Sequence, residues 1–141
     1  MTTIAWDGKT LAAERQITSS GEISCFAKKI RKTLDGRLIG AAGTLGATDA
    51  LLDWLESGGE RPEFLEEKQH AEAIEIHPNG DVWFHAQFHK SKVCRGKHAL
   101  GSGSGYALAA MECGKSAKDA VKIAIKFDTN SGGKIDTLTL D

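Results

Sequence analysis

The chain has 141 residues and a nearly balanced charge, with 18 lysine and arginine residues against 19 aspartate and glutamate residues. A chain of this length buries enough apolar surface for one core without metal or disulfide crosslinks, so a single domain over residues 1–141 is expected. The charge balance argues against nucleic-acid binding and against a polybasic membrane site. No apolar run reaches the roughly 20 residues of a membrane-spanning helix, and the first residues lack a signal-peptide pattern.

The cysteines indicate a reducing compartment. Cys25, Cys94 and Cys113 are odd in number, widely spaced and free of any C-x-x-C pattern. Free thiols in the cytoplasm fit this usage better than a disulfide framework. Cys25 is expected to be a buried thiol.

The first forty residues predict two β-hairpins. Strands are expected at Thr2–Trp6, Lys9–Thr18, Cys25–Leu34 and Arg37–Ala42, with a loop at Ser19–Glu22. The dipeptides Asp-Gly at 7–8 and at 35–36 are strong tight-turn signals between paired strands. The strands carry apolar residues on both sides, which is typical of a sheet that is covered on both faces.

The remainder predicts helices on both sides of such sheets. Apolar residues recur with helical spacing over Thr44–Ser57 and stop at the Gly58-Gly59 pair. The elements expected after this helix are a hairpin of Ala71–His77 and Val82–Ala86, a helix at Gly105–Cys113, a helix opening at Ser116 with a capping pattern, and a strand at Lys134–Leu140. Together these elements predict an α+β protein, a four-layer αββα sandwich.

Thr2 is the first candidate for chemistry. If Met1 is removed, Thr2 carries a hydroxyl nucleophile and a free α-amine on the same residue. The reference pKa of an α-amine is roughly 7.7–8.0, so a useful fraction can accept the hydroxyl proton near neutral pH. No histidine is then needed as the base.

Five sequence blocks, in this order, resemble one known family. They are MTTIAWDGKTLAAERQIT, AKKIRK, GAAGTLGATDALLDWL, ALGSGSGYALAAM and FDTNSGG. This series is similar to the proteasome β-subunit family of N-terminal-nucleophile (Ntn) hydrolases, which includes the bacterial peptidase ring that works with an ATP-driven unfoldase. The resemblance implies an αββα fold, in agreement with the element order.

The resemblance also implies a reaction centre. Thr2 looks like the catalytic threonine and Lys29 like the catalytic lysine, whose charge would stabilise the developing alkoxide. Glu14 stands where the family usually has an aspartate that holds this lysine. The backbone N–H of Gly43 matches the oxyanion donor.

A second group matches residues that support the terminal amine. Ser102, in GSGSG, looks like the serine that hydrogen-bonds this amine. Asp128 and Ser131, in DTNSGG, resemble the pair that supports the amine and the active loop.

Three further matches concern the substrate, which the resemblance implies is a polypeptide. Thr18 matches the residue that pairs with the substrate backbone, and Ala27 and Ala41 match positions that line the specificity pocket. Because both alanines are small, a roomy pocket for large apolar side chains is expected. The family implies a ring-shaped homo-oligomer and allows an ATP-dependent unfoldase as a partner, with no cofactor and no metal.

The chain departs from the family in two places. Glu14 has one more methylene than aspartate, enough to shift the lysine by about an ångström, and a misplacement of that size can cost on the order of 10²-fold in rate. Only the segment 58–70 is available for the second long helix that family members usually carry before the strand at Ala71. One of the two helical layers is therefore expected to contain one helix fewer than in typical family members.

Other interpretations remain open. A catalytically inactive proteasome-like subunit that serves assembly or partner binding is the main alternative, and a small-molecule Ntn amidase is a third. The GSGSG loop is a weak phosphate-binding signal because it lacks G-K-[ST]. A zinc set of His85, His89, Cys94 and His98 is disfavoured, because residues four apart on a strand lie roughly 13 Å from each other.

Overall fold

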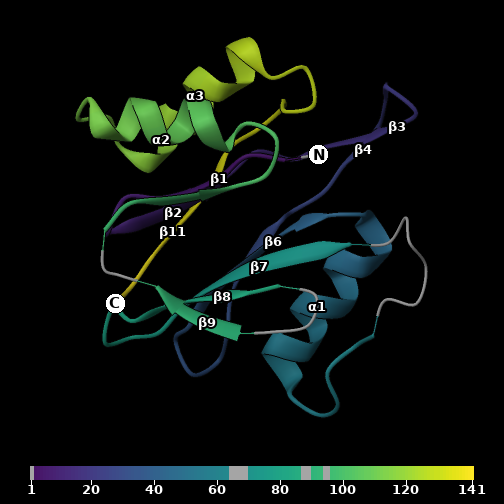
Figure 1. Cartoon of the computed structure of the whole chain (residues 1–141), viewed down its shortest axis with the longest axis vertical. Helices are drawn as coiled ribbons and strands as arrows, with labels where there is room; N and C mark the ends of the chain where they lie inside the picture. Colours follow the sequence, from purple (N-terminus) through teal and green to yellow (C-terminus); the bar gives the residue numbers. More distant parts are fainter. Residues whose placement is uncertain (1, 64–69, 87–89, 94–95) are drawn as a thin grey trace.

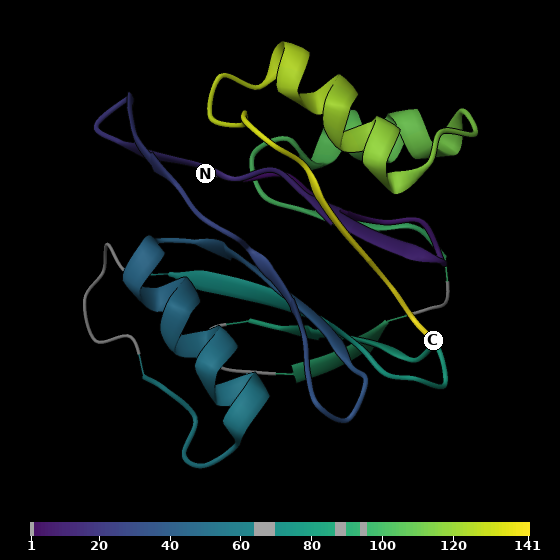
Figure 2. The same ribbon diagram turned by 180° about the vertical axis from the view of Figure 1, so that it is seen from behind.

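Two antiparallel sheets are stacked between helices in the computed structural model, which describes residues 2–63, 70–86, 90–93 and 96–141 (Figures 1 and 2). The first sheet has the strand order β10-β1-β2-β11, and its strands are β1 (Ile4–Trp6), β2 (Thr10–Ala13), β10 (His98–Leu100) and β11 (Asp136–Thr139). The second sheet has the order β5-β6-β7-β8-β9, with β5 (Ile30–Lys32), β6 (Leu38–Gly43), β7 (Ala71–Ile76), β8 (Val82–His85) and β9 (Lys90–Val93). Strands β3 (Gln16–Ser19) and β4 (Glu22–Phe26) form a separate hairpin.

Helices cover the outer face of each sheet. The helices are α1 (Leu45–Ser57), α2 (Ser104–Glu112) and α3 (Ala117–Phe127). Helices α2 and α3 pack on the four-stranded sheet, and α1 packs on the five-stranded sheet (Figure 1). Among the described residues α1 alone covers that second face, as expected for a layer reduced by one helix. The result is the predicted four-layer αββα sandwich.

Three apolar layers hold the four structural layers together. Between the sheets lie buried residues from both, including Ile4, Leu11, Leu38 and Ile74. The α1 layer includes Leu51, Leu52 and Leu55 against Ile39 and Ala73, and the α2–α3 layer includes Met111, Ala120 and Val121 against Ala5 and Ala12. Each fully buried leucine or isoleucine stabilises the fold by roughly 1.5–3 kcal/mol relative to exposure.

The helix boundaries follow local sequence signals. Helix α1 ends at Gly58, which takes a φ of 77° and donates its backbone N–H to the carbonyl of Trp54. Helix α3 begins after Ser116, whose hydroxyl accepts the backbone N–H of Asp119 at 3.2 Å. The predicted glycine stop and serine cap are both confirmed.

Two predicted strands are wrong as continuous elements. The expected strand Lys9–Thr18 is divided into β2 and β3 around Glu14, and Cys25–Leu34 is divided into β4 and β5 around Lys29. At both breaks the chain passes between a stacked sheet and the hairpin β3–β4. The apolar pattern does not show the break, because the break depends on the sheet to which each half belongs: β2 and β5 lie in the two stacked sheets, whereas β3 and β4 pair only with each other. Strand β10, which pairs with β1, was also not predicted.

The hairpin β3–β4 protrudes from the side of the sandwich near the N-terminus (Figures 1 and 2). It replaces the loop expected at Ser19–Glu22, with the turn at Ser20 and Gly21. The prediction that Cys25 is buried is wrong, since the whole of β4 is exposed on this protruding hairpin. An apolar strand pattern alone does not show whether a layer covers the strand.

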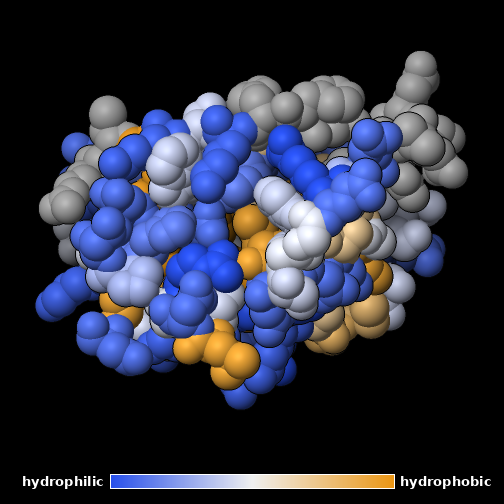
Figure 3. Space-filling model, turned by 90° about the horizontal axis from the view of Figure 1, so that it is seen from below, coloured by the Kyte–Doolittle hydropathy of each residue, from blue (hydrophilic) through white to orange (hydrophobic). Residues whose placement is uncertain are grey.

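Seen from the α1 side, the surface is mainly hydrophilic, with hydrophobic side chains in small separate patches (Figure 3). Within the described part of the chain, no helix combines the length and the apolar character that crossing a bilayer requires.

Candidate active site

A cleft of about 450 Å³ lies where the hairpin β3–β4 meets the two sheets and the start of α1. Six of the residues singled out in the sequence line it: Thr2, Thr18, Ala27, Lys29, Ala41 and Gly43. They come from segments that are far apart in the sequence, and the fold brings them to one place. Thr2 and Lys29 are 4% and 5% exposed, so the two polar groups lie at the bottom of the cleft rather than on its rim.

The Lys29 side chain donates to three acceptors. Its Nζ lies 2.7 Å from Thr2 Oγ1, 2.7 Å from Glu14 Oε1 and 2.6 Å from the backbone carbonyl of Gln16. Burial lowers the pKa of Lys29, and the neighbouring Glu14 carboxylate acts in the opposite direction. Because an ammonium only donates, Thr2 Oγ1 must accept here, and its own proton is left for another acceptor.

Glu14 is fully buried and connects Lys29 to the backbone around it. Its Oε1 also accepts the backbone N–H of Thr3 at 3.0 Å, and its Oε2 accepts those of Gln16 and Gly132, each at 3.0 Å. The extra methylene of glutamate therefore does not take the carboxylate away from Lys29.

Gly43 lies at the end of β6 with a φ of 141°, a conformation that side chains rarely adopt. A Cβ at this position would lie 2.2 Å from the carbonyl oxygen of His70. The close approach of two backbone segments thus requires glycine here. Gly43 also lines the cleft, and its role as the oxyanion donor stays a prediction.

The other three predicted residues form one hydrogen-bonded group beside Thr2. Ser102 and Ser131 both donate to Asp128 Oδ2, at 2.7 Å and 2.6 Å. Burial acts to raise the pKa of Asp128, but the hydrogen bonds from Ser131 and Ser102 outweigh it, so the pKa is lowered. The group contacts the N-terminal strand through Thr3, whose Oγ1 lies 2.7 Å from Ser131 Oγ.

Several contributors were not found in the sequence. The carbonyl of Gln16 and the N–H of Gly132 act through the backbone, which carries no residue-type signal. Thr3 has a hydroxyl in the site, and its position beside Thr2 was the only signal available. Asp49 and Lys28 line the cleft as charged groups that the prediction of an apolar pocket did not include.

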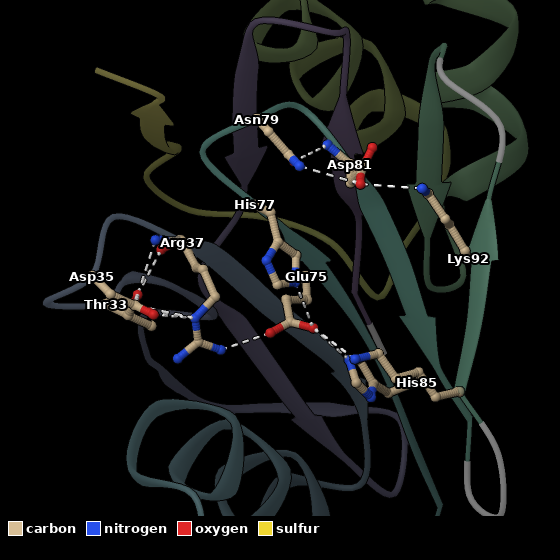
Figure 4. Close-up of polar contacts among 10 residues, drawn as sticks. Thr33, Asp35, Arg37, Glu75, His77, Asn79, Asp81, His85 and Lys92 are labelled. Carbon is tan, nitrogen blue, oxygen red and sulfur yellow. Dashed lines mark hydrogen bonds and ion pairs between the residues drawn. The ribbon is translucent and has the colours of Figure 1, made fainter.

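A second polar cluster, also missed, lies on the outer face of the five-stranded sheet (Figure 4). Glu75 is 4% exposed, its Oε2 accepts from Arg37 Nη1 at 2.6 Å, and its Oε1 lies 3.0 Å from His85 Nε2 and 3.3 Å from His77 Nε2. Burial acts to raise the pKa of Glu75, but the contacts with His85 and Arg37 prevail and lower it to about 2. Because its charges pair among themselves, this cluster is best understood as a structural ion-pair network.

Within the described ranges, no group of three or more histidine, cysteine, aspartate or glutamate side chains could hold a metal ion. His89 and Cys94 of the disfavoured zinc set lie outside the described residues.

No family model and no curated protein matches the chain. Among solved structures, HslV from Trypanosoma brucei superposes with a TM-score of 0.73 at 20% identity, over 99% of this chain and 98% of that one. The fold is that of HslV.

Two structures of a second protein agree with this assignment. Thiobacillus denitrificans BPH has a TM-score of 0.72 at 20% identity, and BPH in complex with epoxomicin has a TM-score of 0.73 at 20% identity. Both alignments cover 99% of this chain and 98% of the BPH chain. The resemblance to the proteasome β-subunit family is thus confirmed at the level of the fold, and the Ntn-hydrolase αββα class with it.

Proposed function

We propose that this chain is a threonine peptidase of the N-terminal-nucleophile type, with Thr2 as the nucleophile once Met1 has been removed. The observation that carries the proposal is the 2.7 Å contact in which buried Lys29 Nζ donates to Thr2 Oγ1. A buried cation aimed at a hydroxyl oxygen stabilises the negative charge that develops on this oxygen during attack. The HslV-like fold supports the same assignment.

We infer the following steps, of which the Lys29 contact with Thr2 Oγ1 supports the second. The α-amine of Thr2 takes the hydroxyl proton, and Thr2 Oγ1 attacks the carbonyl carbon of the scissile amide. Lys29 stabilises the alkoxide, Glu14 holds Lys29 in place, and the Gly43 N–H donates to the substrate oxyanion. The amide C–N bond then breaks, and the proton passes from the amine to the leaving nitrogen. Water, activated by the same amine, hydrolyses the ester on Thr2.

The remaining predicted residues take supporting roles. Thr18 pairs with the substrate backbone, and Ala27 and Ala41 leave space in the pocket. Ser102, Asp128 and Ser131 hold the amine. Polypeptides are the proposed substrates.

Assembly belongs to the same proposal. We propose a ring-shaped homo-oligomer in the cytoplasm with an ATP-dependent unfoldase as a partner. Large exposed apolar side chains support assembly, among them Ile23 (61%) and Phe26 (56%) on β4 and Phe127 (62%) at the end of α3. Light scattering on the purified protein should report a mass several times the 15.1 kDa of one chain, and a mass of one chain would contradict the ring.

The nucleophile is tested by labelling. Protein that begins with Thr2, verified by intact mass, is treated with epoxomicin, the compound bound in the BPH complex. The adduct should be on the N-terminal peptide, and it should be absent in Thr2→Ala and in protein that retains Met1, where the Thr2 nitrogen is an amide. An unlabelled protein with a confirmed Thr2 start would refute the proposal and favour the inactive-subunit alternative.

A further inference from the structure

One face of helix α1 forms a wall of the cleft that contains Thr2. The residues of α1 that line the cleft are Leu45, Thr48, Asp49 and Leu52. They are three or four positions apart, which places them on the same face of the helix. The Thr48 hydroxyl donates to the carbonyl of Leu45 at 2.7 Å, and Leu52 is buried. Among the described residues that line the cleft, the exposed Asp49 is therefore the one carboxylate.

The Asp49 carboxylate has no counter-ion from the described part of the chain. The lysines described as lining the same cleft are Lys28 and Lys29. Lys29 is held in its buried ion pair. The pKa of Asp136 is lowered first by its hydrogen bond with Arg15 and further by the charges of Arg15 and Lys28, so the field of Lys28 acts on Asp136. The negative charge of Asp49 is thus left for a bound molecule to neutralise.

Small residues leave space beside this face of the helix. Ala27 and Ala41 line the cleft of about 450 Å³, and Ala41 belongs to the same apolar layer as Leu52. Lysine and arginine combine an apolar stem with a cationic head, and they bury the stem where the head can stay in water. A side chain of this kind can lay its stem against Ala41 and Leu52 and place its head at the exposed Asp49.

We propose that Asp49 is a specificity-determining residue, which makes the cleft select polypeptides with lysine or arginine as the residue whose carbonyl is attacked. The proposal rests on the proposed function, in which the attacking Thr2 lines this same cleft. It replaces the apolar preference that the two alanines alone predict. A glutamate side chain in this place is repelled by Asp49, and a wholly apolar one leaves the carboxylate without a counter-ion.

The test compares the cleavage of matched peptides by protein that begins with Thr2. The peptides are identical except for the residue before the scissile bond, which is lysine, arginine, glutamate or norleucine, the last having the stem of lysine without its amine. We expect kcat/KM to be about fivefold higher for lysine than for norleucine, the size of an exposed ion pair, and lowest for glutamate. The preference should weaken in about 1 M salt, which screens exposed charges.

Variants of α1 assign the preference to one side chain. Asp49→Asn keeps the size and removes the charge, so it should bring the rates for lysine and norleucine together. Asp49→Lys should favour the glutamate peptide instead. Asp53 is the matched control, because it lies one turn further along α1, pairs with Arg31 at 2.8 Å and is not among the residues that line the cleft. Asp53→Asn should keep the preference of the parent.

Each outcome decides one claim. Equal rates for lysine and norleucine in the parent overturn the proposal, and so does a preference that persists in folded Asp49→Asn or is lost equally in Asp53→Asn. If epoxomicin does not label Thr2 and no peptide is cleaved, the comparison is made by calorimetric binding of the same peptides to Thr2→Ala protein. Tighter binding of the lysine peptide that depends on Asp49 then supports the selectivity and refutes the proposed peptidase, whereas equal binding refutes both.

Discussion

Replacing Lys29 by methionine should lower the rate at which Thr2 reacts far more than it lowers the free energy of unfolding. Methionine is close in length to lysine and fills the same buried space, but it donates no hydrogen bond and carries no charge. The hydrogen bond to Thr2 Oγ1, 2.7 Å in the parent, is lost together with the charge. Removing one preorganised donor to a developing oxyanion costs about 10²–10³ in rate, and we expect this loss in the rate of epoxomicin labelling of Thr2.

The loss of stability in Lys29→Met should be moderate. Removing one partner of a buried ion pair typically costs about 3–5 kcal/mol, because the other charge remains without compensation. Glu14 keeps three backbone donors here, from Thr3, Gln16 and Gly132. We therefore expect about 2 kcal/mol in the free energy of unfolding, measured by urea titration.

The pH dependence gives an independent check on Lys29. Since burial lowers its pKa, the labelling rate of the parent should decline on the alkaline side at a pH below the ordinary 10.5 of lysine. Lys29→Arg keeps the positive charge but replaces the compact ammonium by a guanidinium, and it is the variant with which Lys29→Met is compared. A folded Lys29→Met protein that is labelled within threefold of the parent rate would refute the role assigned to Lys29.

Three further predictions concern Glu14, Gly43 and Glu75. Glu14→Asp restores the residue usual in the family, but its shorter side chain cannot keep all four hydrogen-bond donors of Glu14. We therefore expect the free energy of unfolding to fall by about 1–2 kcal/mol and the epoxomicin labelling of Thr2 to become slower. An unchanged urea titration and an unchanged labelling rate would contradict this. Gly43→Ala should cost about 3 kcal/mol or more, since its Cβ would meet the His70 carbonyl at 2.2 Å, and an unaltered thermal midpoint would show that the backbone relaxes. The Glu75 carboxylate (Figure 4) has its pKa lowered to about 2, so its contribution is present above the ordinary 4.5 and is lost as pH falls toward 2. Lys90 Nζ, 3.8 Å from Glu75 Oε1, and His77 are both partly exposed and screened by solvent, so that contribution is about 1.5 kcal/mol. The stability difference between the parent and Glu75→Gln should therefore shrink over this pH range; a constant difference would contradict the assignment.

The sequence by itself determined the elements whose signals are local. These signals depend only on residues that are neighbours in the chain. They are the apolar spacing of α1 and its end at Gly58, the Ser116 cap of α3 and the Asp-Gly turns, and all were predicted correctly. The order of these elements, with helices on both sides of antiparallel strands, was enough to give the four-layer sandwich. The candidate residues were found because the motif blocks keep their order along the chain.

Only the tertiary structure decided how the site is built. Glu14 and Lys29 lie at breaks between strands, and those breaks arise because one half of each predicted strand belongs to a stacked sheet while the other half belongs to the separate hairpin β3–β4. The carbonyl of Gln16 and the N–H of Gly132 complete the site through the backbone, so no residue type could reveal them. The Glu75 cluster likewise unites residues from β7, β8 and the turn before β6, whose charges look like ordinary surface groups until the sheet brings them together.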